Sequence, residues 1–389
     1  MRAALACALA LAALGCDPAP EETRDAAAAL DGAIDASPEP ADAFAPDAFA
    51  PDGDPVDLGL PDAAPAPDAA SPVDERPLYV ICDSAPDPAL PREDWRHFGS
   101  GLVALGAPGH TAQDVIAFTG RPTQVPGKFA YGLISKDLED EDIIVAVDDC
   151  AGGWRTLGRA ATDSDGRIAL RVEPGDLPPI GRHALWLHVV GDGTAARSTL
   201  TVVPEGTEAI VFDIDGTLTT DDMELFQDVF AELFEPILSG DYVPEARAGA
   251  LELTAVRAWD QGYEIIYLTG RPYLLTDISR EWLDALGFPP GTLHVVDDVA
   301  EILPTNEAVG AYKRDWLRAL REAGLVIEAA YGNATTDIYA YGEAGIDPAR
   351  TFIAGEHGGE AGTVAVGDDY LGHLPVAEAE PPAEQPFRR

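Results

Sequence analysis

A regular alternation of short apolar runs and segments with helical spacing begins near Thr207, and it constrains the fold more than any other feature of this 389-residue chain. The apolar runs predict strands at 209–213, 263–268, 293–296, 326–331 and 351–354. Helical spacing predicts helices at 245–261, 273–286, 312–323 and 336–343. Repeated strand–helix units form a parallel sheet with helices on both faces, so residues 206–374 are predicted to be an α/β domain.

The first motif with chemical meaning, Asp213-Ile-Asp-Gly-Thr217, ends the first of these strands. In open α/β sheets, ligands bind beyond the carboxyl ends of the strands. Alternate residues of an extended segment point the same way, so Asp213 and Asp215 can face one pocket. Two such carboxylates repel unless a cation lies between them, and Mg²⁺ suits this role. Asp213 could then attack phosphorus while Asp215 acts as acid and base. The alternative is an acidic turn in solvent.

The second motif, Thr269-Gly-Arg-Pro272, follows the next strand. A hydroxyl and free backbone N–H groups at a helix start can bind an anion, so Thr269, Gly270 and Arg271 are candidate substrate-binding residues. Arg271 could add positive charge there or pair with a neighbouring carboxylate. The alternative is an ordinary loop.

Two more candidates follow the later strands. Lys313 could neutralise phosphoryl oxygens, and its alternative is a surface lysine. Asn333 and Asp337, in the run Gly332-Asn-Ala-Thr-Thr-Asp337, offer the hard oxygen ligands that Mg²⁺ prefers. Asp337 could instead cap the start of the next helix.

Taken in order at four strand ends, these motifs resemble those of the haloacid dehalogenase superfamily over about residues 207–370. The resemblance implies a Rossmann-like parallel sheet and Mg²⁺-dependent hydrolysis of phosphomonoesters through an aspartyl-phosphate. The resemblance implies that Asp213 is the nucleophile and Asp215 the acid/base. It implies that Thr269 and Lys313 contact the phosphate. The implied metal ligands are Asp213, Asp337 and the backbone carbonyl of Asp215. Many members have Asp where this chain has Asn333, which leaves a direct or water-mediated role for Asn333 open.

A narrower resemblance covers both folded regions, about 77–370. Segments 213–219 and 330–341 are similar to the lipin phosphatidate phosphatases. Other segments resemble the corresponding LNS2 domain of Nir-type membrane-associated phosphatidylinositol transfer proteins and the region before that domain. These segments are 120–122, 127–129, 201–207, 247–250 and 262–272. Those transfer proteins lack the nucleophilic aspartate and are thought to sense phosphatidic acid. Because this chain keeps Asp213 and Asp215, the resemblance favours catalysis over sensing.

Residues 77–205 show a different pattern of short β-type runs separated by turns. The runs are 78–82, 142–147, 168–172, 183–190 and 198–203. Strands at this spacing with little helix predict an immunoglobulin-like β-sandwich. Asp165-Gly166 predicts a hairpin. His183 and His188 lie in strand patterns and are interpreted as structural or exposed rather than as metal ligands.

The N-terminus reads as an export signal. Met1-Arg2 precedes an apolar run to Leu14, which is too short to span a bilayer, and Gly15-Cys16 follows. This ending resembles a bacterial lipobox, so we expect residues 1–16 to be a signal peptide that ends at a lipidated Cys16. An ordinary cleaved signal with an incidental cysteine is the alternative. The interpretation predicts an exported, membrane-anchored lipoprotein of a bacterium, on the periplasmic or cell-surface side.

Two segments are predicted to lack fixed structure. Residues 17–76 are almost entirely Ala, Pro, Asp and Glu, which predicts a disordered linker. Residues 375–389 are predicted to be a flexible tail.

Two cysteines remain after the signal, Cys82 and Cys150. An exported chain meets oxidising conditions, so a Cys82–Cys150 disulfide is our hypothesis. Two free, buried thiols are the alternative.

Apolar residues repeat at helical spacing over 223–237 and predict a small cap helix that packs over the site. The alternative is an acyl-chain contact that dips into lipid. Acidic neighbours argue against strong binding to an anionic surface.

The formal net charge of −43 argues against nucleic acid as a partner and against anionic membrane surfaces. Two function classes remain. The first is a Mg²⁺-dependent phosphatase acting on phosphatidic acid or a related lipid phosphate, with a soluble nucleotide or sugar phosphate as rival substrate. The second is a non-catalytic module that binds phosphatidic acid or a protein partner.

Overall fold

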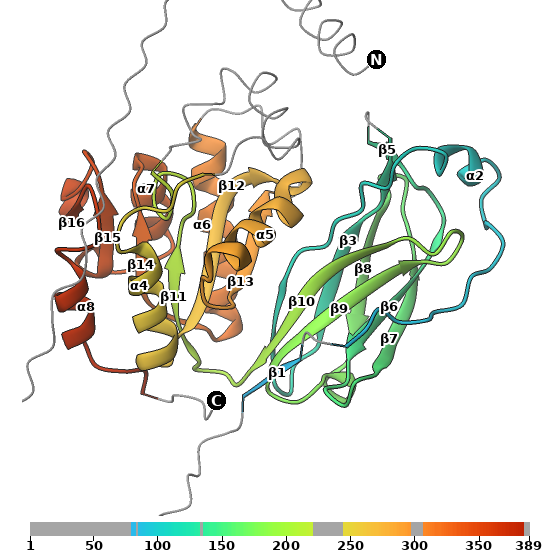
Figure 1. Ribbon diagram of the computed structural model, residues 1–389, viewed down its shortest axis with the longest axis horizontal. Coiled ribbons are helices and arrows are strands. Elements are labelled where there is room, and N and C mark those ends of the chain that lie inside the picture. The colour runs from blue at the N-terminus through green and yellow to red at the C-terminus, as the bar shows by residue number, and fades with distance from the viewer. Residues whose placement is uncertain (1–78, 83–84, 133–134, 221–243, 297–305, 385–389) are drawn as a thin grey trace, which may run out of the picture. The chain divides into compact units, whose positions relative to one another are not determined.

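The computed structural model describes residues 79–384, apart from 83–84, 133–134, 221–243 and 297–305 (Figure 1). The predicted signal with Cys16, the linker 17–76 and the cap segment 223–237 therefore lie outside the described residues. In the part of the chain that is described, no helix has both the length and the apolar character needed to cross a bilayer.

A parallel six-stranded sheet forms the centre of the C-terminal domain, with strand order β13-β12-β11-β14-β15-β16. The α/β prediction is thus confirmed, and Figure 1 shows the sheet with helices on both faces. The strands are β11 (Glu208–Phe212), β12 (Glu264–Pro272), β13 (Thr292–Val296), β14 (Val326–Gly332), β15 (Thr351–Ala354) and β16 (Val364–Gly367).

The helices pack in two layers against the faces of this sheet. They are α4 (Ala250–Ala255), α5 (Thr276–Leu286), α6 (Asn306–Ala323), α7 (Thr335–Glu343) and α8 (Leu374–Ala379), with short helical turns η3 (Val256–Asp260), η4 (Tyr273–Leu275), η6 (Pro348–Arg350) and η7 (Glu360–Gly362). Residues of α4, α5 and α8 share one buried core with Phe212, whereas α6 and α7 share the other with Val211. Successive β11 residues thus point to opposite faces.

Two helix boundaries differ from the sequence prediction. The helix expected from residue 245 begins at Ala250, because Gly249 before it has a φ of +79°, outside the helical range. Helix α6 begins at Asn306, six residues before the predicted start at 312.

The C-terminal segment is also ordered further than predicted. The tail expected to be flexible from residue 375 forms α8, and Ala377 is fully buried. Gln261 donates hydrogen bonds from Nε2 to the carbonyl oxygens of Ala377 and Glu380, and Glu380 pairs with Arg350. A six-residue helix that contains proline carries too little periodicity to be recognised in the sequence.

The N-terminal domain is a β-sandwich, as predicted. The larger sheet has the path β2-β10-β9-β6-β7, with β1 paired to β9, while β3 pairs with β8 and β4 with β5. Its elements are β1 (Val80–Cys82), α2 (Ser100–Val103), β2 (Val115–Phe118), β3 (Thr123–Lys128), β4 (Ala130–Tyr131), β5 (Lys136–Asp137), β6 (Asp142–Asp148), β7 (Trp154–Ala161), β8 (Arg167–Val172), η1 (Pro174–Asp176), β9 (Gly181–Val189) and β10 (Ala195–Val203). Val145 and Leu187 of the larger sheet share a core with Val125 and Ile168 of the smaller one.

The predicted hairpin at Asp165-Gly166 is wrong, although the turn exists. Gly166 has a φ of +66°, and its N–H donates to the carbonyl of Asp163. The flanking strands do not pair with each other, because β7 pairs with β6 and β8 pairs with β3. The turn therefore carries the chain from one sheet of the sandwich to the other.

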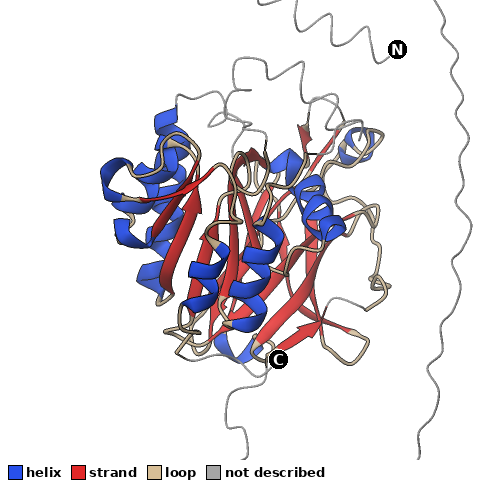
Figure 2. Cartoon of the chain, turned by 60° about the vertical axis from the view of Figure 1, so that its left-hand side comes forward, coloured by secondary structure: helices blue, strands red, loops and turns tan. Residues whose placement is uncertain are grey.

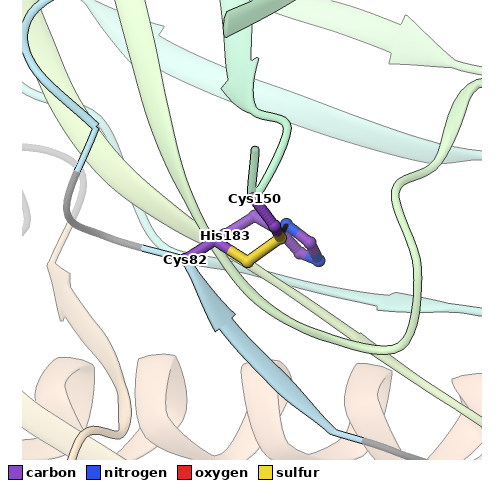
Figure 3. A group of neighbouring side chains, drawn as sticks. All are labelled: Cys82, Cys150 and His183. Atoms are coloured by element: carbon purple, nitrogen blue, oxygen red, sulfur yellow. Dashed lines mark hydrogen bonds between the residues drawn. A yellow bond between two sulfur atoms is a disulfide. The ribbon is translucent and has the colours of Figure 1, made fainter. Parts of the chain in front are cut away.

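A disulfide joins Cys82 of β1 to Cys150 after β6, with Cα atoms 5.0 Å apart (Figure 3). His183 lies beside it, with Nδ1 3.4 Å from the Cys150 sulfur and Nε2 2.9 Å from the carbonyl oxygen of Pro179. Among the described residues, these three form the one group of His, Cys, Asp or Glu whose donor atoms all lie within 4.8 Å. A disulfide leaves no thiolate for a metal.

The sandwich covers the edge of the parallel sheet at β13. Gln113 donates from Nε2 to the carbonyl oxygen of Val295 at 2.7 Å, and Asp114 accepts from the N–H of Leu293 at 2.9 Å. Arg280 of α5 donates two hydrogen bonds to the same Asp114 carboxylate. Backbone groups of an edge strand need such partners, so the second domain closes this edge. Figure 2 shows helices and strands of the chain from a second direction.

Candidate active site

Three of the four motifs lie at the carboxyl ends of strands of the parallel sheet, and the remaining candidate, Lys313, lies in α6. Asp213 follows β11 directly, Thr269 and Arg271 lie in the last residues of β12, and Asn333 follows β14. The N–H of Asp213 donates to the carbonyl oxygen of Tyr331 at 2.9 Å, which ties the first motif to the fourth. Parallel strands place these ends together, as the sequence predicted.

Lys313 bridges the first and fourth motifs. Its Nζ donates to Oδ1 of Asp213 and to Oδ1 of Asp337, both at 2.8 Å. All three side chains are buried, so the surface-lysine alternative is wrong. Burial raises the pKa of Asp213 well above its ordinary value, while Lys313 opposes the rise and the charges of Asp337 and Asp215 add to it. A buried carboxyl group whose pKa is perturbed by burial and by specific charged neighbours marks a candidate functional site.

Arg271 binds the second carboxylate of the first motif. Its Nε lies 3.0 Å from both oxygens of Asp215, and Nη2 lies 2.7 Å from Oδ1. Thr269 adds a hydrogen bond from Oγ1 to Oδ2 of Asp215 at 2.9 Å. Of the two roles considered for Arg271, the structure shows pairing with a carboxylate, and Ser279 of α5 accepts from its remaining Nη1 at 2.9 Å.

No α-helix begins at the second motif, where the sequence suggested a backbone anion site. Strand β12 continues through Pro272, and α5 begins only at Thr276. The N–H of Arg271 donates instead to Oγ1 of Thr269 at 3.1 Å. A Cβ on Gly270 would lie 3.0 Å from Cγ1 of Val309, so this strand end packs closely against α6.

Gly216 lets the first motif approach the fourth, and Gly332 allows close packing within the fourth motif. Gly216 has a φ of +72°, and a Cβ there would lie 2.2 Å from Nδ2 of Asn333. A Cβ on Gly332 would lie 2.6 Å from Cβ of Asp337. Thr217 donates from Oγ1 to Oδ1 of Asn333 at 3.0 Å, which fixes the orientation of this amide. Any side chain at Gly216 would push the two motifs apart.

Asp337 takes the helix-capping role considered for it, and its second carboxylate oxygen binds Lys313. Its Oδ2 accepts from the N–H groups of Asn333 and Ala334 at the start of α7, at 3.0 and 3.2 Å. Its other oxygen, Oδ1, accepts from Lys313. One carboxylate thus caps a helix and faces the site.

Sequence reasoning missed Arg247 as part of the site. Its Nε donates to the carbonyl oxygen of Thr217 at 3.1 Å, and its two other nitrogens donate to the carbonyl oxygens of Gly216 and Asp368. Arg247 therefore holds the turn of the first motif against the segment that precedes Tyr370. No motif spacing marks it, because its partners are backbone atoms of distant residues.

The site contains oxygen donors of the kind that a hard divalent cation binds. Asp213, Asp337, Asn333 and the carbonyl of Asp215 offer oxygen ligands, as Mg²⁺ requires. Three carboxyl groups, those of Asp213, Asp215 and Asp337, are bound by two cationic side chains, Lys313 and Arg271. The carboxylates of this site do not converge as a trio within 4.8 Å among the described residues, since Arg271 holds Asp215 and Lys313 lies between the other two.

Comparisons with known proteins agree with this architecture. Residues 210–355 match the family model described as "PITM 1-3, LNS2 domain", and residues 108–202 match "PITM 1-3, beta-sandwich domain". Membrane-associated phosphatidylinositol transfer protein 1 of Homo sapiens is 32% identical over 315 residues, which cover 78% of this chain and 23% of that protein. Membrane-associated phosphatidylinositol transfer protein 3 of Homo sapiens is 32% identical, over 76% of this chain and 29% of that protein. Protein retinal degeneration B of Drosophila melanogaster is 30% identical, over 75% of this chain and 22% of that protein.

The chain spans less than a third of the length of these curated relatives. The two matched regions fall on the β-sandwich and on the parallel sheet with its motifs. The chain therefore contains a β-sandwich domain and an LNS2 domain of the haloacid dehalogenase-like type, and both are related to those of the membrane-associated phosphatidylinositol transfer proteins.

Proposed function

We propose that this chain is a Mg²⁺-dependent phosphomonoester hydrolase that acts through an aspartyl-phosphate on phosphatidic acid or a related lipid phosphate. The observation that carries the proposal is the buried Asp213, held by Lys313 against Asp337, with Asp215 two residues along the same turn. A chain that only bound a phosphate would need the positive charge of Lys313 but not the carboxyl groups of Asp213 and Asp215.

Asp213 is the proposed nucleophile. Lys313 occupies Oδ1, so attack on phosphorus comes from Oδ2. The new bond joins Asp213 to phosphorus, and the ester bond to the leaving alkoxide breaks. Lys313 remains close enough to neutralise charge on the phosphoryl oxygens.

Asp215 is the proposed acid and base. It gives a proton to the leaving alkoxide, and it later takes a proton from the water that attacks phosphorus and frees Asp213. Three hydrogen bonds from Arg271 hold the Asp215 side chain in place for the second step. Asp215 must turn away from Arg271 to deliver a proton in the first step.

Asp213, Asp337, Asn333 and the carbonyl of Asp215 would hold the Mg²⁺. When bound, the ion supplies positive charge that offsets the repulsion between Asp213 and an anionic phosphate.

Two observations support a lipid phosphate as substrate. The relatives are named as membrane-associated phosphatidylinositol transfer proteins, and the chain resembles the lipin phosphatidate phosphatases in two motifs. A lipid on Cys16, followed by the linker 17–76, would hold the enzyme beside a membrane and raise the encounter rate with its lipids. We propose an exported, membrane-anchored location on this basis.

The test is a phosphate-release screen with the full chain. Phosphatidic acid in neutral vesicles is compared with soluble nucleotide and sugar phosphates, with Mg²⁺ and with EDTA. The proposal expects Mg²⁺-dependent release that is fastest from the vesicles. Faster release from a soluble ester would show that the substrate is that ester and not a lipid phosphate. No release from any ester would contradict the proposal that the chain is an enzyme.

One observation favours a second function, recognition of phosphatidic acid without turnover. Thr269 and Arg271 both bind Asp215, which ties up the acid/base group. In that case the wild type and Asp213→Asn would bind phosphatidic acid vesicles equally, and neither would release phosphate.

A further inference from the structure

Tyr370 is a fully buried tyrosine whose hydroxyl has no hydrogen-bond partner. Within the described residues, four buried side-chain polar atoms share this condition: Trp186 Nε1, Ser198 Oγ, His294 Nδ1 and Tyr370 Oη. Leaving a buried donor unpaired costs stability, so each such group calls for an explanation. Tyr370 is the one among them that we connect to the turn of the first motif, through Arg247 and Ala248.

Backbone contacts place Tyr370 beside that turn. Its N–H donates to the carbonyl oxygen of Ala248 at 2.9 Å. The neighbouring Arg247 binds the carbonyl oxygens of Thr217 and Asp368. Residues 368–370 are therefore fastened to the first motif through Arg247 and Ala248.

The ring of Tyr370 also lies close to the end of the central strands. It meets the ring of Tyr331 edge-on, with centroids 6.0 Å apart and an interplanar angle of 78°. The carbonyl oxygen of Tyr331 accepts from the N–H of Asp213. Burial raises the pKa of Tyr370, and the charges of Asp213 and Asp337 contribute to the rise. The hydroxyl therefore stays protonated and remains a donor within the electrostatic reach of both carboxylates.

Other buried tyrosines of the same domain do find partners. Tyr267 donates to the carbonyl oxygen of Pro289 at 2.8 Å, and Tyr341 donates to that of Tyr331 at 3.0 Å. The hydroxyl of Tyr331 accepts a hydrogen bond from Nη2 of Arg257 at 2.7 Å. The same core leaves the hydroxyl of Tyr370 without a partner.

We propose that Tyr370 is a phosphate-binding residue, whose hydroxyl donates a hydrogen bond to an oxygen of a phosphate group bound beside Asp213. The inference rests on the proposed function only in placing a phosphate group there. Phosphate oxygens are strong, charged acceptors, so a donor without a competing partner binds them without first breaking a bond. The cost of the unpaired hydroxyl in the free protein is then regained on binding.

The test compares Tyr370→Phe with Tyr267→Phe in the full chain. Tyr267 is the matched control, because it is also buried in this domain and its hydroxyl has a backbone partner. Thermal unfolding is measured with Mg²⁺ alone and with Mg²⁺ over a series of inorganic phosphate concentrations. A second arm replaces phosphate with phosphatidic acid vesicles, and phosphate release from them is followed in parallel.

We expect Tyr370→Phe to unfold at the wild-type temperature or above it without phosphate, because no hydrogen bond is lost. Its dissociation constant for phosphate should rise about tenfold, since one charge-assisted hydrogen bond is missing. Tyr267→Phe should show the reverse, with a lower unfolding temperature and the wild-type dissociation constant. If the dissociation constant rises only in the arm with phosphatidic acid vesicles, the hydrogen bond from Tyr370 is made to the lipid phosphate.

A clear fall in the unfolding temperature of ligand-free Tyr370→Phe would overturn the inference, as would an unchanged dissociation constant in both arms or a wild type that binds neither form of phosphate. The two proposals fail separately. If the wild type releases phosphate and Tyr370→Phe binds as tightly as the wild type, the inference on Tyr370 alone is lost. If the wild type binds phosphate through Tyr370 but releases no phosphate from any ester, the proposed hydrolase activity is wrong and the inference about Tyr370 holds.

Discussion

Arg271 holds the carboxylate of Asp215 with three hydrogen bonds, from Nε to both oxygens and from Nη2 to Oδ1. Both side chains are buried, so the pair is screened from water. The guanidinium fork fixes which way the carboxylate faces, and Ser279 in turn fixes the guanidinium. Arg271 is therefore a positioning residue for the group that is proposed to move the proton.

Replacing Arg271 with Lys keeps the charge but removes the fork. We expect the rate constant for phosphate release at saturation to fall at least about tenfold, because Asp215 loses its fixed orientation. The Michaelis constant should change less, since Arg271 binds Asp215 in the structure. Steady-state kinetics on vesicles of phosphatidic acid would measure both, and an unchanged rate constant with a raised Michaelis constant would show that Arg271 binds substrate instead.

Lys313→Met removes the one ammonium between Asp213 and Asp337. Breaking a buried ion pair from one side leaves unpaired charge, which costs about 3–5 kcal/mol. Urea unfolding in EDTA at neutral pH should show a loss of this size, and part of it should return with Mg²⁺. The control is Arg318→Met, which removes from α6 an exposed ion pair with Glu343 of α7 and should cost less than about 1 kcal/mol. Equal losses would contradict the buried bridge.

His110 makes the sandwich sensitive to acid. The N–H of Ala130 donates to its Nδ1 at 3.3 Å, and its Nε2 lies 2.9 Å from Oγ1 of Thr194, so the ring is held neutral. Burial lowers the pKa of His110 to about 4, below the ordinary value of 6.5, and the charge of Asp192 opposes this.

A depressed folded-state pKa means that the unfolded chain takes up the proton first. The contribution of His110 to stability is therefore complete above pH 6.5 and is lost as the pH falls toward 4, by roughly 3 kcal/mol in all. In His110→Gln this part of the acid dependence should disappear. Unfolding free energies of both proteins between pH 7 and 4 would measure it, and parallel curves would show that His110 is not the group responsible.

The disulfide between Cys82 and Cys150 closes a loop across a sequence separation of 68 residues. A cross-link over such a loop stabilises by about 4 kcal/mol through the entropy of the unfolded chain. Reduction, or the Cys82→Ser and Cys150→Ser pair, should therefore lower the unfolding temperature. Alkylation followed by mass measurement tests the bond itself, because labelling of both cysteines without reductant would mean free thiols.

The positions of the strand ends could be predicted from the sequence, because apolar runs and the polar residues after them are local patterns. Apolar runs followed by Asp213, Thr269 and Asn333 place polar groups at the carboxyl edge of a parallel sheet before any contact is known. The side chains that these groups bind could not be predicted in the same way. The sequence names Lys313 as a candidate phosphate contact, with a surface lysine as the alternative, but only the fold shows it buried between two carboxylates.

Other features depend on contacts between residues far apart in the chain. Arg247 binds carbonyl oxygens, which leave no trace in the residue types around it. Strand β8 pairs with β3 rather than with its neighbour β7, because the sandwich core and not the Asp165-Gly166 turn decides the partner. Helix α8 is held by Gln261 and by the ion pair of Glu380 with Arg350, which no short-range pattern predicts.

The most direct test of the account is Mg²⁺-dependent phosphate release from phosphatidic acid by the wild type and by Asp213→Asn. Asp260→Asn, which changes an exposed aspartate of the same domain, is the control. The account predicts release by the wild type and by Asp260→Asn, and a loss of at least about a thousandfold in Asp213→Asn, because the nucleophile is gone. Release by Asp213→Asn at the wild-type rate would contradict the role of Asp213, and no release by the wild type would contradict catalysis altogether.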